Sequence, residues 1–295
     1  MDEVIKISIT GDLGSGKSTV CEILKSKQSF VVYSTGKIQR QIAILHNMST
    51  YELNQYAEAH PEIDDEIDHA LMKLSFFDQN IVIDSRMAWH FVQNTFKVYL
   101  TTDRLVAAGR VMCDFRGSSE GYTDIHDAER QLAARKRSEN ARYQSKYRVN
   151  CAKLRNFDCV IDTTLIPQEE VADRILAQQK IWSGGDKTPL VLLSPLRLFP
   201  TGDMRRLTAP THEETEKIKI LFVNDDFYIF DGHRAVAAHA RLGRKVIACD
   251  LVAEDNETVV PGISAWQYVR DACSITRIHQ WESYNGFSFL SYPNR

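Results

Sequence analysis

The sequence predicts an α/β protein with a parallel sheet covered by helices on both faces, followed by a smaller α+β domain. Across residues 1–183, short apolar runs alternate with helical stretches, which is the pattern of strands joined by helical crossovers. After the Gly-rich, polar segment 183–189 the alternation ends, and short apolar runs dominate. The 295 residues exceed the roughly 100–200 residues of one domain, so we expect two domains, at 1–183 and 189–295.

The apolar runs of the first domain are expected to be buried strands, and the stretches between them helices. The expected strands are 4–10, 30–35, 80–85, 96–102 and 157–164. The expected helices are 17–27, 36–48, 103–117, 124–150 and 167–182, the last with Pro167 in its first turn. In the second domain, 190–195, 218–224, 227–230 and 245–252 are the short apolar runs, and 235–243 is an expected helix.

Composition excludes several classes of function. The net charge of -3 gives no reason to expect general attraction to nucleic acid or membranes. No window approaches the ~20 apolar residues of a membrane span, and the N-terminal MDEVIKISIT is unlike a signal peptide. The six cysteines form no C-x-x-C pair, which is typical of reduced thiols in a cytoplasmic protein.

A glycine-rich loop is the most specific motif of the first domain. Residues 11–18, GDLGSGKS, fit G-x-x-x-x-G-K-[ST] between an expected strand and an expected helix. In such a loop backbone amides cradle phosphate oxygens, a lysine reaches the β- and γ-phosphates, and a hydroxyl ligates Mg²⁺. We therefore expect ATP and Mg²⁺ as cofactors. The expected cofactor-binding residues are Gly11, Gly14, Ser15, Gly16, Lys17, Ser18, Thr19 and Arg110, with Ser18 and Asp84 at the metal.

Further segments follow this loop in a recognisable order. They are YSTGKIQRQIA with Ser34, Gly36 and Arg40; MSTYELNQYAEAHPEIDDEID with the run 61–64; IVIDSRMAW with Asp84, Arg86 and Trp89; ARKRSENARYQSKY with Arg135, Ser138, Glu139, Arg142, Tyr143 and Tyr147; and FDCVIDTT. Together they resemble the short cytidylate kinases of the P-loop nucleoside-monophosphate kinase family, over about 60% of the chain.

The resemblance implies ATP-dependent phosphoryl transfer to a small nucleoside monophosphate, with CMP or dCMP the expected acceptor. Arg135 and Arg142 are seven residues apart, so on a continuous helix they would share one face and clamp the transferring phosphoryl group. Arg40 and Arg86 would hold the acceptor phosphate by bidentate contacts. The expected catalytic residues are Lys17, Asp84, Arg135 and Arg142, and the expected substrate-binding residues are Ser34, Gly36, Arg40, Asp64 and Arg86.

Some positions depart from the family pattern. Ser85 stands where a glycine is usual, Gln39 where an aromatic residue commonly precedes the acceptor arginine, and Lys136 and Arg137 where acids are usual. Asp12 is also uncommon in a phosphate-binding loop, since a carboxylate there is unfavourable unless it points outward. These departures leave open a modified pyrimidine nucleotide or another small acceptor.

A second anion site is expected in the C-terminal domain. SPLRLFPTGDMRRL and the turn Asp231-Gly232-His233-Arg234, which opens a helix, resemble the ParB/sulfiredoxin-like domain over roughly 190–255. The resemblance implies a nucleotide or phosphate at this turn. In the alternative, Asp231 only caps the helix while His233 and Arg234 lie on the surface.

The remainder of the C-terminal domain leaves the biological task open. A kinase for free serine and a DNA-associated switch that binds a nucleoside triphosphate both remain alternatives. The tail shows neither a helix-turn-helix pattern nor a basic surface, so nucleic acid is not an expected partner. The tail aromatics Trp266, Tyr268, Trp281, Tyr284 and Phe287 are expected to pack the domain.

Overall fold

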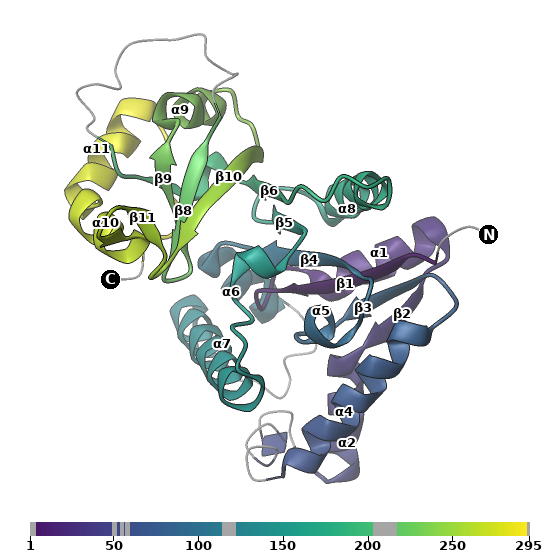
Figure 1. Ribbon diagram of the computed structural model, residues 1–295. Helices are drawn as coiled ribbons and strands as arrows, with labels where there is room; N and C mark the ends of the chain where they lie inside the picture. The colour runs from purple at the N-terminus through teal and green to yellow at the C-terminus, as the bar shows by residue number, and fades with distance from the viewer. Residues whose placement is uncertain are drawn as a thin grey trace. The chain divides into compact units, whose positions relative to one another are not determined.

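The computed structural model describes residues 4–48, 52–53, 56, 60–113, 122–202 and 217–293 (Figure 1), and the chain divides into two compact units. Unit 1 comprises Met1–Thr102, Val106–Cys159 and Pro167–Pro189, and unit 2 comprises Asp103–Leu105, Val160–Ile166 and Leu190–Arg295. Two short segments from the first half of the sequence therefore group with the C-terminal residues. Their contacts lie within unit 2 as well: Asp103 accepts a hydrogen bond from Ser291, Asp162 accepts one from the backbone of Ser194, and β5 (Cys159–Asp162) neighbours β6 (Leu190–Leu193) in the sheet.

The sheet of unit 1 is parallel, as the sequence predicts. It contains β1 (Lys6–Gly11), β2 (Val31–Ser34), β3 (Ile81–Asp84) and β4 (Phe96–Thr101) in the order β2-β3-β1-β4. The central strands are buried on both faces: β3 is apolar except for its last residue, and in β1 the polar Ser8 and Thr10 are buried along with Ile7 and Ile9. This order places the ends of β1 and β3 side by side, at the edge where the glycine-rich loop begins.

Helices cover the sheet of unit 1 on both sides. Figure 1 shows α1 (Lys17–Gln28) and α8 (Gln168–Ser183) along one face and the short α5 (Ala88–Phe91) along the other. The other helices in the described part of unit 1 are α2 (Thr35–Leu45), α4 (Pro61–Lys73), α6 (Arg104–Cys113) and α7 (Ile125–Tyr147), with 3-10 turns at Leu74–Phe76 and Leu154–Asn156. The long helix expected at 124–150 is confirmed as α7: the Asp124 side chain caps it, and Arg148 ends it in a left-handed conformation.

Unit 2 has a mixed sheet, and its described residues include the α-helices α9 (His233–Arg241), α10 (Ala265–Ala272) and α11 (Ile275–Asn285). Its strands run in the order β5-β6-β10-β8-β9-β7, with both parallel and antiparallel pairs. They are β5 (Cys159–Asp162), β6 (Leu190–Leu193), β7 (Leu198–Pro200), β8 (Lys219–Val223), β9 (Asp226–Asp231) and β10 (Ile247–Glu254), and β11 (Thr258–Val260) pairs with β12 (Ile263–Ser264). A 3-10 turn lies at Pro195–Arg197.

The C-terminal aromatics pack only in part as expected. Trp281 is 1% exposed and belongs to the core of unit 2, but Trp266 and Tyr284 are 40% and 62% exposed, so the expectation is wrong for these two. Helix α10 is not among the expected helices, although Ser264 and Gln267 form a capping box at its start. Within the described ranges, no helix combines the length and apolar character that crossing a membrane requires.

A buried carboxylate organises one edge of unit 2. Asp162 at the end of β5 is fully buried and accepts hydrogen bonds from the backbone amides of Thr164 and Ser194, at 2.9 and 3.0 Å. The Arg197 guanidinium lies 3.2 Å from the same carboxylate. Asp162 thus fixes the start of the Pro195–Arg197 turn against the end of β5.

Replacing Arg197 with Met should destabilise unit 2 by about 3–5 kcal/mol, because the Asp162 carboxylate is then buried without its ion-pair partner. Urea unfolding, read out by hydrogen exchange of peptides from β6 and β10, measures the loss. Lys219→Met is the matched control: Lys219 pairs with Asp231, their side chains are 45% and 55% exposed, and the change should cost less than about 1 kcal/mol. Equal losses in the two variants would contradict a structural role for the buried pair.

Candidate active site

The loop between β1 and α1 has a backbone that needs its glycines. Gly11, Gly14 and Gly16 have φ values of 145°, 75° and 84°. A Cβ atom on Gly11 would lie 2.1 Å from the Leu100 carbonyl oxygen, and one on Gly14 would lie 2.7 Å from that of Ala107. Side chains are thus excluded by backbone conformation and by space, as expected of a phosphate-cradling loop.

The lysine of the motif folds over this loop. Lys17 Nζ donates hydrogen bonds to the carbonyl oxygens of Gly11 and Asp12, at 3.0 and 2.6 Å. Burial, assisted by the charge of Arg86, lowers the pKa of Lys17 to about 8. An incoming phosphate would therefore exchange these carbonyl contacts for a stronger, charge-assisted contact to the same ammonium.

The two residues expected at the metal lie together. The Ser18 hydroxyl donates a hydrogen bond to Asp84 Oδ2 at 2.9 Å, at the point where β3 ends beside the first turn of α1. A hydroxyl and a carboxylate are hard oxygen donors, and Mg²⁺ typically takes only one or two protein oxygens besides phosphates and water. Among the described residues no three His, Cys, Asp or Glu side chains group as a metal site. The donor set at Ser18 and Asp84 thus fits Mg²⁺ bound together with phosphate.

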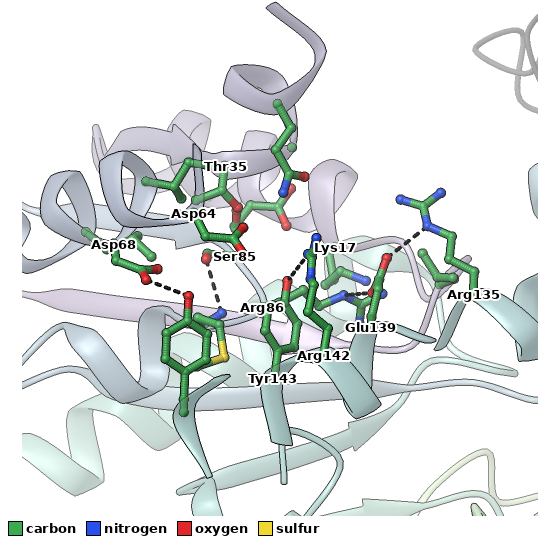
Figure 2. A pocket seen from close by; sticks show the side chains of 18 residues that line it. Lys17, Thr35, Asp64, Asp68, Ser85, Arg86, Arg135, Glu139, Arg142 and Tyr143 are labelled. Atoms are coloured by element: carbon green, nitrogen blue, oxygen red, sulfur yellow. Dashed lines mark hydrogen bonds and ion pairs between the residues drawn. The ribbon is translucent and has the colours of Figure 1, made fainter. Parts of the chain in front are cut away.

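A cavity of about 140 Å³ opens beside the loop, within unit 1 (Figure 2). Its lining comes from the starts of α1 and α2, from α4, from the segment after β3 and from α7. The predicted residues that line it are Lys17, Gly36, Asp64, Asp84, Arg86, Arg135 and Arg142. The structure thus brings together cations and acids that are spread over more than one hundred residues of sequence.

The arginines in this cavity share a buried carboxylate. Glu139 Oε2 lies 3.0 Å from Arg86 Nε, and Glu139 Oε1 lies 2.9 Å from Arg135 Nε (Figure 2). Burial favours a raised pKa for Glu139, but the charges of Arg86 and Arg135 outweigh it and lower the pKa. Arg86 also donates to the Gly11 carbonyl, so it lies against the loop itself. Glu139 therefore holds both guanidinium groups in place and keeps them beside the loop.

Arg142 approaches the cavity from the same helix. Its Nη2 lies 3.4 Å from the Tyr143 hydroxyl, while its buried Nε has no hydrogen-bond partner among the described residues. A buried guanidinium N–H without a partner is costly, and a phosphate oxygen would satisfy it.

The far end of the cavity is acidic and apolar. Asp64 and Asp68 lie one turn apart on α4 and are 7% and 8% exposed. Tyr147 donates to Asp68 Oδ2 at 2.5 Å, and Lys146 Nζ lies 3.7 Å from Asp64. Burial raises the pKa of Asp68, and the bond from Tyr147 opposes the rise. The apolar walls at this end are Ile67, Leu71 and Met87.

The other predicted residues are not among the described residues that line the cavity. Ser34 caps α2 through its side chain. Arg110 Nη1 lies 3.2 Å from the Gly14 carbonyl, and the Ser15 hydroxyl donates to the Asp12 carbonyl. Thr19 is exposed. Arg40 is exposed too, although its Nη1 lies 3.5 Å from where a Cβ atom of Gly36 would be.

Several lining residues were not predicted as site residues. They are Leu13, Thr35, Gln39, Ile67, Asp68, Leu71, Ser85, Met87, Glu139, Tyr143 and Tyr147. Two of them had a signal in the sequence: Asp68 follows Asp64 by four residues, and Glu139 lies between Arg135 and Arg142 at helical spacing.

The side chains of the turn expected to hold a second phosphate have other hydrogen-bond partners than the sequence suggests. Gly232, with φ 86°, precedes α9, and Asp231 accepts a hydrogen bond from the Gly232 amide rather than capping the helix. His233 is only 9% exposed, and its Nε2 accepts from the backbone amides of Thr201 and Gly202, at 3.1 and 2.8 Å. His233 therefore lies neither on the surface nor free to donate from Nε2 to an anion. A phosphate at Gly232 and Arg234 stays a prediction.

Comparisons with known proteins agree with the geometry of unit 1. A family model described as an AAA domain matches residues 7–114. Cytidylate kinase from Sulfolobus acidocaldarius is 35% identical over 174 residues, which cover 58% of this chain and 92% of that protein. Cytidylate kinase from Thermoplasma volcanium is 32% identical, covering 58% of this chain and 90% of that protein.

Two further similarities are more limited. An S-adenosylmethionine-dependent nucleotide dehydratase from Lacinutrix mariniflava is 30% identical over 187 residues, and this chain spans only 38% of its length. Among solved structures, shikimate kinase from Acinetobacter baumannii in complex with shikimate is 18% identical over 63% of this chain, with a TM-score of 0.41.

The affinity for ATP should fall as the pH rises through about 8. Burial favours the neutral form of Lys17, so its charge is lost near pH 8 rather than near its ordinary pKa of 10.5, and only the ammonium neutralises phosphate. Above this pH the affinity should drop by up to about tenfold per unit. Calorimetric titration with Mg–ATP across about pH 6.5 to 9.5 measures it. Lys17→Arg stays charged and should flatten the profile, whereas a flat wild-type profile would contradict the assignment.

Acidification should destabilise unit 2 through His233. Burial lowers the pKa of His233 from 6.5 to about 4; Asp231 opposes the shift and Arg277 adds to it, so the unfolded chain binds the proton more readily than the folded one. The stability from neutral His233 is complete above pH 6.5 and is lost as the pH falls towards 4, by about 3 kcal/mol in total. Urea unfolding at several pH values tests this. His233→Gln should remove the dependence, and the exposed His279→Gln should retain it.

Proposed function

Because the chain belongs to the cytidylate kinase family through 58% of its length, we propose that it transfers the γ-phosphoryl group of ATP to a pyrimidine nucleoside monophosphate, with CMP or dCMP the acceptor. The observation that carries the proposal is that Lys17, Arg86, Arg135 and Arg142 face two carboxylates of α4 in one cavity. The cations suit phosphate groups, and the carboxylates suit a base that donates hydrogen bonds.

On the donor side, the loop amides and the start of α1 bind the ATP phosphates. Lys17 leaves the carbonyl oxygens of Gly11 and Asp12 and contacts the β- and γ-phosphates. Ser18 and Asp84 would hold Mg²⁺, which when bound supplies further neutralisation of phosphate charge.

The transfer itself needs positioning and charge neutralisation more than covalent chemistry. An oxygen of the acceptor phosphate attacks the γ-phosphorus, the bond from that phosphorus to the β–γ bridging oxygen breaks, and ADP leaves. Arg135 and Arg142 stabilise the charge that develops on the transferring group, and Arg86 stabilises it from beside the loop.

On the acceptor side, chemistry favours an amine-bearing pyrimidine. The exocyclic amine of cytosine can donate a hydrogen bond to the carboxylate of Asp64 or Asp68. Uracil has a carbonyl oxygen at that position, which a carboxylate repels.

A modified pyrimidine nucleotide is the second candidate acceptor. Gln39 and Ser85, two of the departures from the family pattern, both line the cavity. An amide and a hydroxyl could bind an additional polar substituent on the ring.

For unit 2 we propose a ParB/sulfiredoxin-like role, in which Gly232 and Arg234 bind a phosphate or nucleotide that regulates the kinase.

A coupled assay for ADP release tests the proposal with CMP, dCMP, UMP and AMP. The wild-type protein should turn over CMP or dCMP at least about tenfold faster, in kcat/KM, than UMP, because the wrong base leaves a buried carboxylate without a donor. Lys17→Ala should lower the rate by more than about a hundredfold, since it removes the contact to the β- and γ-phosphates. ADP release that no monophosphate raises above the rate with ATP alone would exclude the proposal.

The variant Asp68→Asn separates base reading from phosphate transfer. It keeps size and packing but adds an amide donor, so discrimination between CMP and UMP should shrink while the KM for ATP stays the same. Arg234→Ala is the matched control in unit 2 and should leave the discrimination between bases unchanged.

A further inference from the structure

Two departures from the family pattern meet in the structure. Asp12 belongs to the glycine-rich loop, and Lys136 belongs to α7, more than one hundred residues later. Lys136 Nζ lies 2.7 Å from Asp12 Oδ1, and the two side chains are 17% and 16% exposed. The carboxylate that looks unfavourable beside phosphate is thus neutralised by the lysine that stands where an acid is usual.

The Asp12 carboxylate points away from the phosphate side of the loop. Tyr99 donates its hydroxyl to Oδ1 at 2.9 Å, while Thr101 Oγ1 and the Thr102 amide donate to Oδ2, at 2.8 and 3.3 Å. These donors come from the end of β4, so the carboxylate is fixed to the sheet. Lys136 therefore pairs with a carboxylate that is itself fixed to the sheet.

Lys136 is not part of the phosphate site. Neither Lys136 nor Asp12 lines the cavity, whereas Arg135, the preceding residue on α7, does. Adjacent side chains on a helix point about 100° apart. Lys136 can therefore anchor α7 to the loop while Arg135 faces the cavity.

The middle of α7 buries none of its described side chains. The buried residues of the helix are Ala128, Leu132 and Tyr143, so no buried residue lies between Leu132 and Tyr143, the stretch that contains Arg135 and Arg142. The first half of α7 packs on α6 through Ala128 and Leu132, and Leu13 of the loop packs against the same cluster. Beyond that cluster, the ion pairs of Lys136 and Glu139 hold the helix beside the loop.

We propose that the Asp12–Lys136 pair is a positioning contact that registers α7 on the glycine-rich loop, so that Arg135 and Arg142 face the transferring phosphoryl group. Lys136 neutralises Asp12, which removes the repulsion that a carboxylate in the loop would exert on ATP. The pair contacts neither substrate and acts through the arginines. The catalytic consequence rests on the proposed kinase function, but the anchoring itself does not.

Kinetics of Asp12→Asn, Lys136→Met, the double variant and Lys136→Arg test the catalytic consequence with ATP and CMP. Each single variant should lower kcat about 10- to 100-fold, because the arginines are displaced from the reacting group, while the KM for CMP changes less than about threefold. Lys136→Met should also raise the KM for ATP, because it leaves the Asp12 carboxylate without its neutralising lysine. The double variant should be no slower than the worse single variant, since both remove one interaction. Lys136→Arg should recover most of kcat. Arg130→Met, whose exposed side chain pairs with Asp127 on the same helix, should leave kcat unchanged.

Hydrogen exchange of the α7 amides tests the anchoring without any substrate. Exchange over 133–142 should rise about tenfold in Asp12→Asn and in Lys136→Met, and the double variant should match the single ones. If the two single effects multiply in the double variant, or if exchange and kcat stay at the wild-type level, the positioning contact is disproved and the kinase function is untouched. A wild-type protein that phosphorylates no monophosphate would instead disprove the kinase function, and exchange would then decide the contact alone.

Discussion

The neutralisation of clustered positive charge is the constraint on which unit 1 depends. Lys17, Arg86, Arg135 and Arg142 converge on one half-buried cavity, where like charges repel and desolvation penalises each of them. The carboxylate of Glu139 compensates Arg86 and Arg135. The lowered pKa of Lys17 shows that desolvation and the charge of Arg86 still disfavour its ammonium form. The site thus holds cations that can bind phosphate, and the Glu139 carboxylate keeps two of them beside the loop.

The parts of this arrangement that could be predicted are those set by local sequence. The loop 11–18, the alternation of strands and helices and the long helix α7 follow from backbone conformation and periodicity, which act over a few residues. The approach of Arg135 and Arg142 to the cavity followed from their spacing of seven on a helix. Glu139 and Asp68 were not predicted as site residues, because their roles depend on partners on other elements, Arg86 and Tyr147.

Unit 2 shows the same limit more strongly. A turn with glycine, histidine and arginine before a helix suggests an anion site. What each of these side chains binds is decided by its neighbours in the folded unit. His233 points inward and accepts hydrogen bonds from Thr201 and Gly202, which precede it by about thirty residues. Only the long-range pairing of β7 with β9 brings these amides to the ring. Short elements such as β7, with three residues, give too few positions for a periodic signal.

Charge balance also indicates what the cavity needs from its cofactors. Among the described residues, its lining contains the cations Lys17, Arg86, Arg135 and Arg142 and the acids Asp64, Asp68, Asp84 and Glu139, so its formal charge is near zero. A nucleoside triphosphate and a monophosphate together add several negative charges, which this neutral lining does not balance by itself. The loop amides and the positive end of α1 supply part of the compensation. Ser18 and Asp84 would hold a divalent cation, and the positive charge of that cation would supply the rest.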